Sequence, residues 1–290
     1  MVQLHIKKGD ESQFLYDSSV NTTVDECYNS VTMIYNGRLK INRICNDMEQ
    51  LSKHGTMLPS NIAGLTEEQV EELKLVDEWG EKCLPSGDWT LNKDPVGRRN
   101  GKQPDESMQK LIMKAVDEAK AIISKKQVQA GVFLNQKKIQ ETLDMLQGTV
   151  TIVYPMNLPP HDPIRLEFEN CEDLTGTQAS LEVIDPALAQ LWFSGKLLER
   201  GKKLSDYLGR NEKTKVVLKI SKSGTGPPPK ESILTEEEKK LMMLHAFRRQ
   251  EELKKLEQDD DDVYLNSSWA DSAALKKSFQ GVTDIKWKAQ

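Results

Sequence analysis

Hydrophobic and polar residues alternate over positions 2–7 of the chain, which is the pattern of a β-strand with one buried face. Val2, Leu4 and Ile6 occupy one side, and polar residues occupy the other. A turn at Gly9 follows, and Gln13–Tyr16 is predicted to return as a second strand. The chain is therefore expected to open on a β-hairpin.

The next apolar residues recur every three to four positions, which predicts a helix with one buried face. Thr23 and Glu26 have the spacing of a capping box at its start, and Gly55 suits its C-terminal cap. The Asn36-Gly37 pair would kink or end this helix. A ubiquitin-like β-grasp opens with this order of strand, strand and helix, but many other α+β folds do so too.

The middle of the chain contains one segment without hydrophobic periodicity and other segments whose apolar residues recur at helical spacing. Thr66 and Gln69 are spaced to cap a short helix. Residues 77–104 are rich in Gly, Pro and Trp, and we expect a long loop there. Two further helices are predicted within 105–148, the second of them ending at Gly148.

The segment 149–223 is expected to order its elements as strand, strand, helix and strand. The predicted strands are Thr149–Tyr154, Ile164–Phe168 and Lys215–Ile220, and Asp185-Pro186 has the pattern of a helix start. The string QLWFSGKLLERGKKLSDYLGRNEKTKVVLKI is similar to the C-terminal half of ubiquitin, in which a strand stands where the Asp-Pro pair predicts a helix. We give the cap and the helical period more weight.

Composition changes again at Gly224, where the string GTGPPP predicts a linker. A densely charged helical pattern runs from Thr235 to Gln258, and the four aspartates 259–262 would end that helix. The α+β chain is thus expected to comprise an N-terminal α+β domain (1–76), a long loop (77–104), a helical segment (105–148), a ubiquitin-like α+β unit (149–223) and an arm of linker, charged helix and Trp-bearing terminus (224–290).

The net charge, the apolar runs and the cysteine spacing argue against several classes of protein. The 290 residues carry a formal net charge of −5, which does not favour binding to a polyanion such as nucleic acid. The N-terminus has no apolar signal region, and no apolar run is long enough to span a membrane. The four cysteines are widely spaced and form no Cys-x-x-Cys pair, so free thiols in a reducing compartment are expected.

No motif for chemistry appears in the chain. The four histidines are scattered, and none stands in a zinc-ligand pattern. The Gly-rich string at 223–226 lacks the lysine of a phosphate-binding loop. We therefore expect no catalytic residue, no cofactor and no metal site.

Tryptophans and basic residues in the expected loop and arm are the candidate contacts for a protein partner. Large aromatic side chains gain free energy only when they are buried, either on their own chain or on a partner. The arginine pair would attract an acidic partner. The candidates are Trp79, Arg98, Arg99, Trp269, Asp271, Ile285 and Trp287.

Several strings, spread from one end of the chain to the other, resemble the Kurly family of cilia- and flagella-associated proteins. They include DESQFL, YNGRLK, GLTEEQVEELKLVDEWGEKC, GRRNGK, IVYPMNLPPHDPIRLEFEN, RRQEELKKLE and DIKWKAQ. The resemblance implies a protein of the cytoplasm, the cilium basal body and the cytoskeleton that motile cilia need. It implies a role in outer dynein arm assembly and in cilium positioning linked to planar cell polarity.

The same resemblance implies association with a MYND zinc-finger dynein assembly factor and with other dynein arm assembly proteins, and it supplies no catalytic residue. We interpret the chain as a non-enzymatic assembly factor. The alternative is a structural component that binds axonemal microtubules permanently.

Overall fold

The computed structural model describes residues 1–209, 211–228, 236–263 and 277. The chain divides into two compact units, Met1–Lys230 and Glu231–Gln290. The described elements are β1 (Val2–Lys8), β2 (Glu11–Ser18), α1 (Val24–His54), α2 (Glu67–Glu72), α3 (Glu78–Lys82), β3 (Trp89–Leu91), β4 (Lys102–Pro104), α4 (Glu106–Ile123), α5 (Lys126–Gln129), α6 (Gln136–Val153), α7 (Pro163–Phe168), α8 (Gln178–Glu182), β5 (Ala189–Phe193), β6 (Lys196–Leu197), α9 (Ser205–Leu208), β7 (Lys215–Lys222) and, in the second unit, α10 (Glu236–Val263).

The first unit is built on a mixed five-stranded sheet with the order β2-β1-β7-β5-β6. The expected N-terminal hairpin is confirmed, because β1 and β2 pair antiparallel. β1 also pairs in parallel with β7, which places Leu4 beside Val216. The α+β class is therefore right. The expected order of strand, strand, helix and strand over 149–223 is wrong except for its last strand, which is confirmed as β7 and completes a sheet that begins at residue 2.

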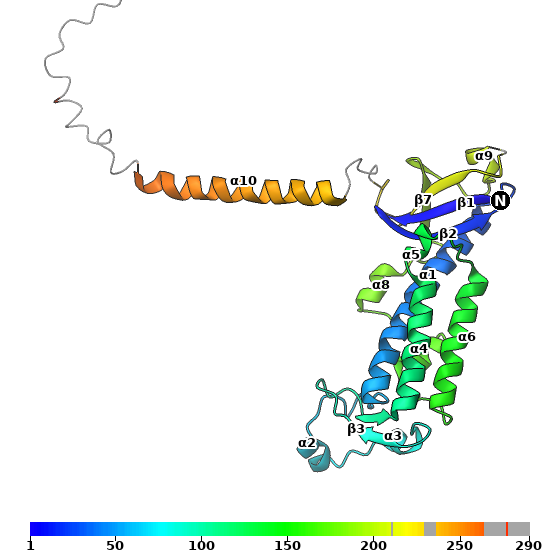
Figure 1. Ribbon diagram of the computed structural model, residues 1–290, viewed down its shortest axis with the longest axis vertical. Helices are drawn as coiled ribbons and strands as arrows, with labels where there is room; N and C mark the ends of the chain where they lie inside the picture. The colour runs from blue at the N-terminus through cyan, green and yellow to red at the C-terminus, as the bar shows by residue number, and fades with distance from the viewer. Residues whose placement is uncertain (210, 229–235, 264–276, 278–290) are drawn as a thin grey trace, which may run out of the picture. The chain divides into compact units, whose positions relative to one another are not determined.

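Helix α1 links this sheet to a bundle of helices (Figure 1). Its capping box is confirmed, since Glu26 N donates to Thr23 Oγ1 and Thr23 N donates to the Glu26 carboxylate. With 31 residues the helix is about 46 Å long. α4 and α6 pack along it, and the buried side chains of the sheet and the bundle form one continuous core.

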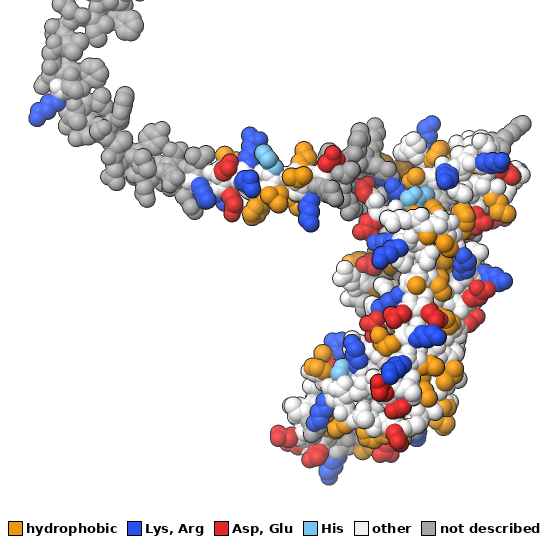
Figure 2. Space-filling model, viewed as in Figure 1, with side chains coloured by type: hydrophobic (Ala, Val, Ile, Leu, Met, Phe, Trp, Pro, Cys, Tyr) orange, Lys and Arg blue, Asp and Glu red, His pale blue; other side chains and the backbone are white. Residues whose placement is uncertain are grey.

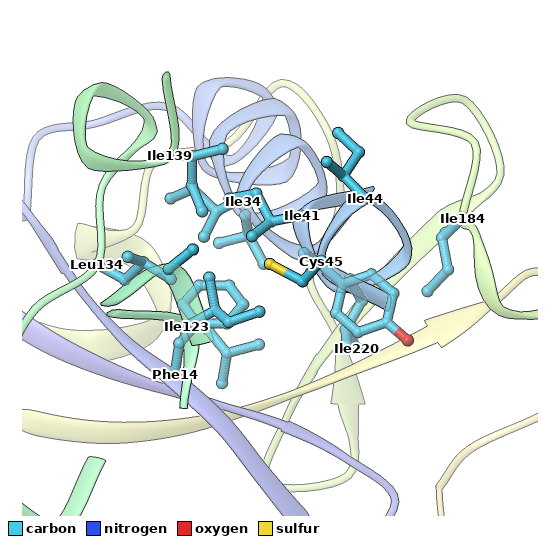
Figure 3. Close-up of a cluster of buried hydrophobic side chains, with 14 of the residues drawn as sticks. Phe14, Ile34, Ile41, Ile44, Cys45, Ile123, Leu134, Ile139, Ile184 and Ile220 are labelled. Carbon is cyan, nitrogen blue, oxygen red and sulfur yellow. The ribbon is translucent and has the colours of Figure 1, made fainter. Parts of the chain in front are cut away.

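The core is a layer of branched aliphatic side chains around α1. Figure 3 shows Phe14 of β2, Ile41 of α1 and Ile123 of α4 turned toward one another, with Leu134 and Ile139 beside them. Burial of each such side chain contributes roughly 1.5–3 kcal/mol. This packing, rather than local propensity, fixes where the helices lie.

Two predicted strands are helical. Thr149–Tyr154 belongs mostly to α6, which continues through Gly148 because Leu146, Val150 and Val153 keep the helical spacing and are buried. Packing thus outweighs the β-propensity of this Val- and Thr-rich segment. Ile164–Phe168 lies in α7, where Asp162 caps the helix and Pro163 holds its first position.

The predicted helix at Asp185-Pro186 is also wrong. Asp185 accepts a hydrogen bond from the Ala187 backbone at 2.8 Å and closes a turn, after which the chain enters β5. Ala189 and Leu191 are buried in alternation with half-buried neighbours, which is the period of a strand. The strand that the ubiquitin-like string indicated is the one observed.

Two other expectations are corrected. The segment 77–104 is not a continuous loop, because it contains α3 and the β3–β4 hairpin. The aspartates 259–262 do not end the charged helix, because α10 runs through them to Val263. The short helix capped by Thr66 and Gln69 is confirmed as α2.

Helix α1 neither kinks nor ends at Asn36-Gly37. The Asn36 side chain donates to Ile184 O at 2.7 Å and accepts from Ile184 N at 3.1 Å, which ties the helix to the chain before β5. Gly37 allows α6 to come close, since a Cβ on this residue would lie 2.6 Å from Ile139 Cγ2. Glycine is present here for packing.

This close approach makes a testable prediction with a matched control. Gly37→Ala should destabilise the protein by roughly 1–3 kcal/mol, because the stiff Ile139 side chain has to move. Gly148→Ala should stabilise it by up to about 1 kcal/mol, because a Cβ on Gly148 of α6 meets nothing within 4 Å. Urea unfolding of both variants measures the difference.

The second half of this test is a double-mutant cycle. In an Ile139→Ala background, which removes the clashing methyl group, Gly37→Ala should cost little. A stabilising effect of Gly37→Ala in the natural background would contradict the proposed reason for this glycine.

Candidate interaction surface

The end of the bundle farthest from the sheet is formed by residues 55–104, which we call the tip (Figure 1). It starts where α1 ends, at Gly55, whose N–H donates to Leu51 O at 3.0 Å. Asn92 Nδ2 donates to Lys53 O at 3.0 Å, and the His54 ring contacts Asn92 O at 3.2 Å. The tip is thus fixed to the last turn of α1 by hydrogen bonds.

Arg99 is the cation that holds the tip in place. Its Nη1 donates to Gly55 O at 2.8 Å, and its Nη2 donates to Asp47 O at 3.3 Å. The residues on either side of Arg99 add backbone hydrogen bonds, in which Leu58 N donates to Arg98 O and Asn100 N donates to Thr56 O. The Arg99 guanidinium is therefore occupied by the protein's own backbone.

Asp94 shapes the turn that presents the two arginines. Its carboxylate accepts from the backbone N–H groups of Val96, Arg98 and Arg99, at 3.0, 2.8 and 3.1 Å. Burial favours the neutral form of Asp94, but these three hydrogen bonds outweigh it and lower the pKa of the carboxyl group. An ionised Asp94 therefore orders the turn.

Two carboxyl groups lie near Arg99, one buried and one half-buried. Asp162 is fully buried and accepts from Met57 N at 3.1 Å and from Ile164 N at 3.0 Å. Burial raises the pKa of Asp162, and the charge of Arg99 opposes that increase. Burial raises the pKa of Asp47 too, again against the charge of Arg99.

Two tryptophans form the exposed part of the tip. Trp79 of α3 is 38% exposed and Trp89 of β3 is 42% exposed. Lys82 Nζ lies 5.2 Å from the ring centre of Trp79, and Lys102 Nζ lies 5.4 Å from that of Trp89. Lys102 also donates to Gly80 O at 2.7 Å, so one lysine joins α3 to the hairpin. We call Trp79, Trp89 and their surroundings the tryptophan surface.

The segment of the chain that carries the two tryptophans is acidic. Residues 65–89 contain eight acidic and two basic side chains. Figure 2 shows this end of the bundle, where acidic and basic side chains lie beside apolar ones.

The structure separates the predicted contact residues. Trp79 and Arg98 are exposed, and the guanidinium of Arg99 is engaged in hydrogen bonds within the tip. Trp269, Asp271, Ile285 and Trp287 lie outside the described residues. Trp89 was not among the candidates, although its place near Trp79 in a segment with two tryptophans is a signal that could have found it.

Among the described residues, no group of three or more His, Cys, Asp or Glu side chains could hold a metal ion. None of the described helices is both long and apolar enough to cross a membrane. The four cysteines are free thiols, three of them buried.

Comparisons with known proteins agree with one another. The family model of cilia- and flagella-associated protein 298 matches residues 189–285. The chain is 60% identical over 288 residues to the protein of that name from Mus musculus and, separately, to that from Homo sapiens; it is 53% identical to that from Drosophila melanogaster. Each match covers 99% of both chains. No solved structure matches the chain.

The geometry of the tip predicts different roles for its two arginines. Arg99→Gln should destabilise the protein by roughly 2–4 kcal/mol, because it removes two hydrogen bonds and the cation near the carboxyl groups of Asp162 and Asp47. Arg98→Gln should change stability by less than about 0.5 kcal/mol. Thermal unfolding of the two variants measures this difference.

The cost of Arg99→Gln should also depend on pH. Asp162 and Asp47 have raised pKa values in the folded state, so the folded protein binds protons more readily than the unfolded chain and gains stability as pH falls. Without Arg99 the ionised carboxylates of Asp162 and Asp47 lose a stabilising charge. The loss in free energy of unfolding caused by Arg99→Gln should therefore be larger at pH 8 than at pH 5. An equal deficit at both values would mean that the two carboxyl groups do not sense Arg99.

Proposed function

Because the chain belongs to the cilia- and flagella-associated protein 298 family, we propose that it is a non-enzymatic adaptor that assembles outer dynein arms for motile cilia. The observation that carries the proposal is the 60% identity to relatives of that name over 99% of both chains. The same proposal includes a part in cilium positioning and planar cell polarity, and residence in the cytoplasm and at the basal body.

Two exposed elements give an adaptor the means to hold partners. One is the tryptophan surface, which stands on a rigid bundle, and tryptophan is among the residues most enriched at binding hot spots. The other is α10, whose side chains at Leu241, Leu244 and Phe247 are more than half exposed and share one stripe. The proposed partners are a MYND zinc-finger dynein assembly factor and other dynein arm assembly proteins.

The proposal extends to the fold of the sheet. β1, β2, α1, β5, β6 and β7 form a ubiquitin-like β-grasp in which residues 55–188 are inserted between the helix and the third strand. The sheet order, with two antiparallel hairpins on either side of the parallel β1–β7 pair, supports this reading. The inserted residues carry the bundle and the tip, and hence the tryptophan surface.

The tryptophan surface is tested by the double variant Trp79→Ala, Trp89→Ala. Since both side chains are partly exposed, the variant should remain folded, but it should lose co-precipitation with the MYND zinc-finger factor and fail to restore ciliary motility to deficient cells. The control variant Met156→Ala, Leu181→Ala removes exposed apolar side chains elsewhere on the first unit and should behave as the natural protein. Full binding by the tryptophan variant would exclude this surface as the contact.

Cell fractionation distinguishes an assembly factor from a permanent axonemal component. An assembly factor stays in the cytoplasmic pool of ciliated cells and is absent from salt-washed axonemes. Retention of the protein on axonemes after salt extraction would favour the alternative, a structural protein that binds axonemal microtubules.

The stripe of α10 requires a separate test. Leu241→Gln, Leu244→Gln, Phe247→Gln keeps a residue with good helix propensity at each position and removes the apolar contact. Partner binding should fall at least tenfold with no change in the melting temperature of the first unit. The control Lys240→Gln, His245→Gln, Arg249→Gln changes polar positions of the same helix and should bind normally. A lowered melting temperature in the apolar variant alone would mean that the stripe packs on the protein's own first unit.

A further inference from the structure

Two cavities lie side by side between the sheet and the bundle, away from the tip. The first has a volume of about 380 Å³ and is lined mainly by apolar side chains, among them Phe14, Leu134 and Met145. The second has a volume of about 500 Å³ and a polar, basic lining. Gln13, Ile123 and Ser124 line both cavities, so the two cavities adjoin at these three residues.

Arg38 of α1 lines the second cavity and is only 9% exposed. Its Nε and Nη2 donate to Ile123 O at 3.2 and 2.9 Å, and its Nη1 donates to Gln13 Oε1 at 3.1 Å. All of these acceptors are neutral. Of the five N–H groups of the guanidinium, two have no acceptor among the described residues.

The carboxylates around the second cavity do not neutralise Arg38. Lys125 is paired with Glu11 of β2 and Lys120 of α4 with Glu49 of α1. Lys8 of β1 donates to the Tyr35 hydroxyl, another neutral acceptor, at 2.7 Å. Glu182 of α8, an exposed carboxylate, also lines this cavity. Lys8 lies opposite Glu11 in the sheet and helps to lower the pKa of Glu11.

Part of the role of Arg38 is structural. Ile123 is the last residue of α4, so Arg38 caps the negative end of that helix. A helix end carries the equivalent of about half a negative charge, which compensates a full positive charge only in part. Burial lowers the pKa of Arg38 to about 10, so the side chain is still charged at neutral pH. A buried cation without a full counter-charge is costly for a protein to keep unless it binds something.

Arg38 also stands next to the apolar cavity. Its guanidinium carbon lies 5.6 Å from the ring centre of Phe14, which lines that cavity, and Figure 3 shows Phe14 beside Ile123 and Leu134. An apolar space of 300–1,000 Å³ with a few placed polar groups is typical of a small-molecule site. The first cavity supplies the apolar space, and the second supplies the polar groups.

We propose that the two cavities form one binding site for a small amphiphilic anion, with its carboxylate or phosphate on Arg38 and its apolar body beside Phe14. The anion accepts hydrogen bonds from the two remaining N–H groups of Arg38, and it takes the place of Gln13 Oε1 as acceptor of the third, from Nη1. Lys8 adds a second positive charge on the same side. The apolar body lies against Leu134 and Met145.

The test uses the full-length protein with ten-carbon probes. Decanoate and decyl phosphate carry the two anionic groups, 1-decanol is the uncharged match, and decyltrimethylammonium is the cationic match. Calorimetry measures affinity, and the methyl resonance of Met145 in protein labelled at the methionine methyl groups reports whether the apolar cavity is filled. The anions should bind saturably at one site, at least tenfold more tightly than decanol, and should shift the Met145 resonance.

Three variants locate the site. Arg38→Gln should weaken decanoate binding by roughly 10- to 100-fold, the value of a charge-assisted hydrogen bond, and leave decanol binding unchanged. Lys8→Gln should weaken binding of the anions several-fold, whereas Lys114→Gln, on an exposed face of α4, should not. Val132→Trp places a large side chain at the edge of the apolar cavity and should block all the probes, whereas Ile152→Trp on an exposed face should block none.

These outcomes decide the proposal even if Arg38→Gln fails to fold, because the Lys8 and Val132 variants change partly exposed positions. Equal affinity for decanoate and decanol would overturn the role of Arg38. Absence of saturable anion binding up to millimolar concentration, or binding that Val132→Trp does not affect, would overturn the site itself.

Discussion

Burial of α1 over most of its circumference is the constraint on which the rest of the structure depends. This helix packs on the sheet at one end and on α4 and α6 along its length, so its buried positions go well beyond one narrow stripe. Small and branched side chains allow neighbouring elements to pack closely around α1. At Gly37 the absence of a side chain lets Ile139 approach the helix backbone. Because α1 runs from the sheet to the tip, it also sets the distance between the two cavities beside the sheet and the tryptophan surface.

The hairpin and α1 were predicted correctly because two independent signals agree in each of them. The hairpin has both alternation and a turn, and α1 has both a helical period and a capping box. The prediction of a helix at Asp185 failed because an aspartate before a proline can either begin a helix or close a turn. Asp162 and Asp185 both precede proline, and both accept the N–H of the residue two positions on. The first pair begins a helix and the second closes a turn, and only the packing of the following residues decides between them.

The tip could be predicted only in part for a related reason. The length and tryptophan content of 77–104 indicated a functional segment, but Trp89 and Lys102 lie thirteen positions apart and meet only through the β3–β4 pairing. Arg98 and Arg99 are identical in type and adjacent in sequence. The turn formed around Asp94 directs the Arg99 side chain to the end of α1, and no pattern of residue types encodes that direction.

The pairing of β1 with β7 has a consequence for how the protein is made. Leu4 meets Val216 across a gap of about 200 residues, so a ribosome needs roughly 10–40 s to deliver the second strand after the first. Throughout that interval the nascent hairpin exposes the edge of β1 together with Val2, Leu4 and Ile6, which are fully buried in the finished sheet. Closure of so long a loop is slow. The nascent chain is thus a natural client for chaperones, and a transcript cut short before β7 would yield an aggregating product instead of a smaller working protein.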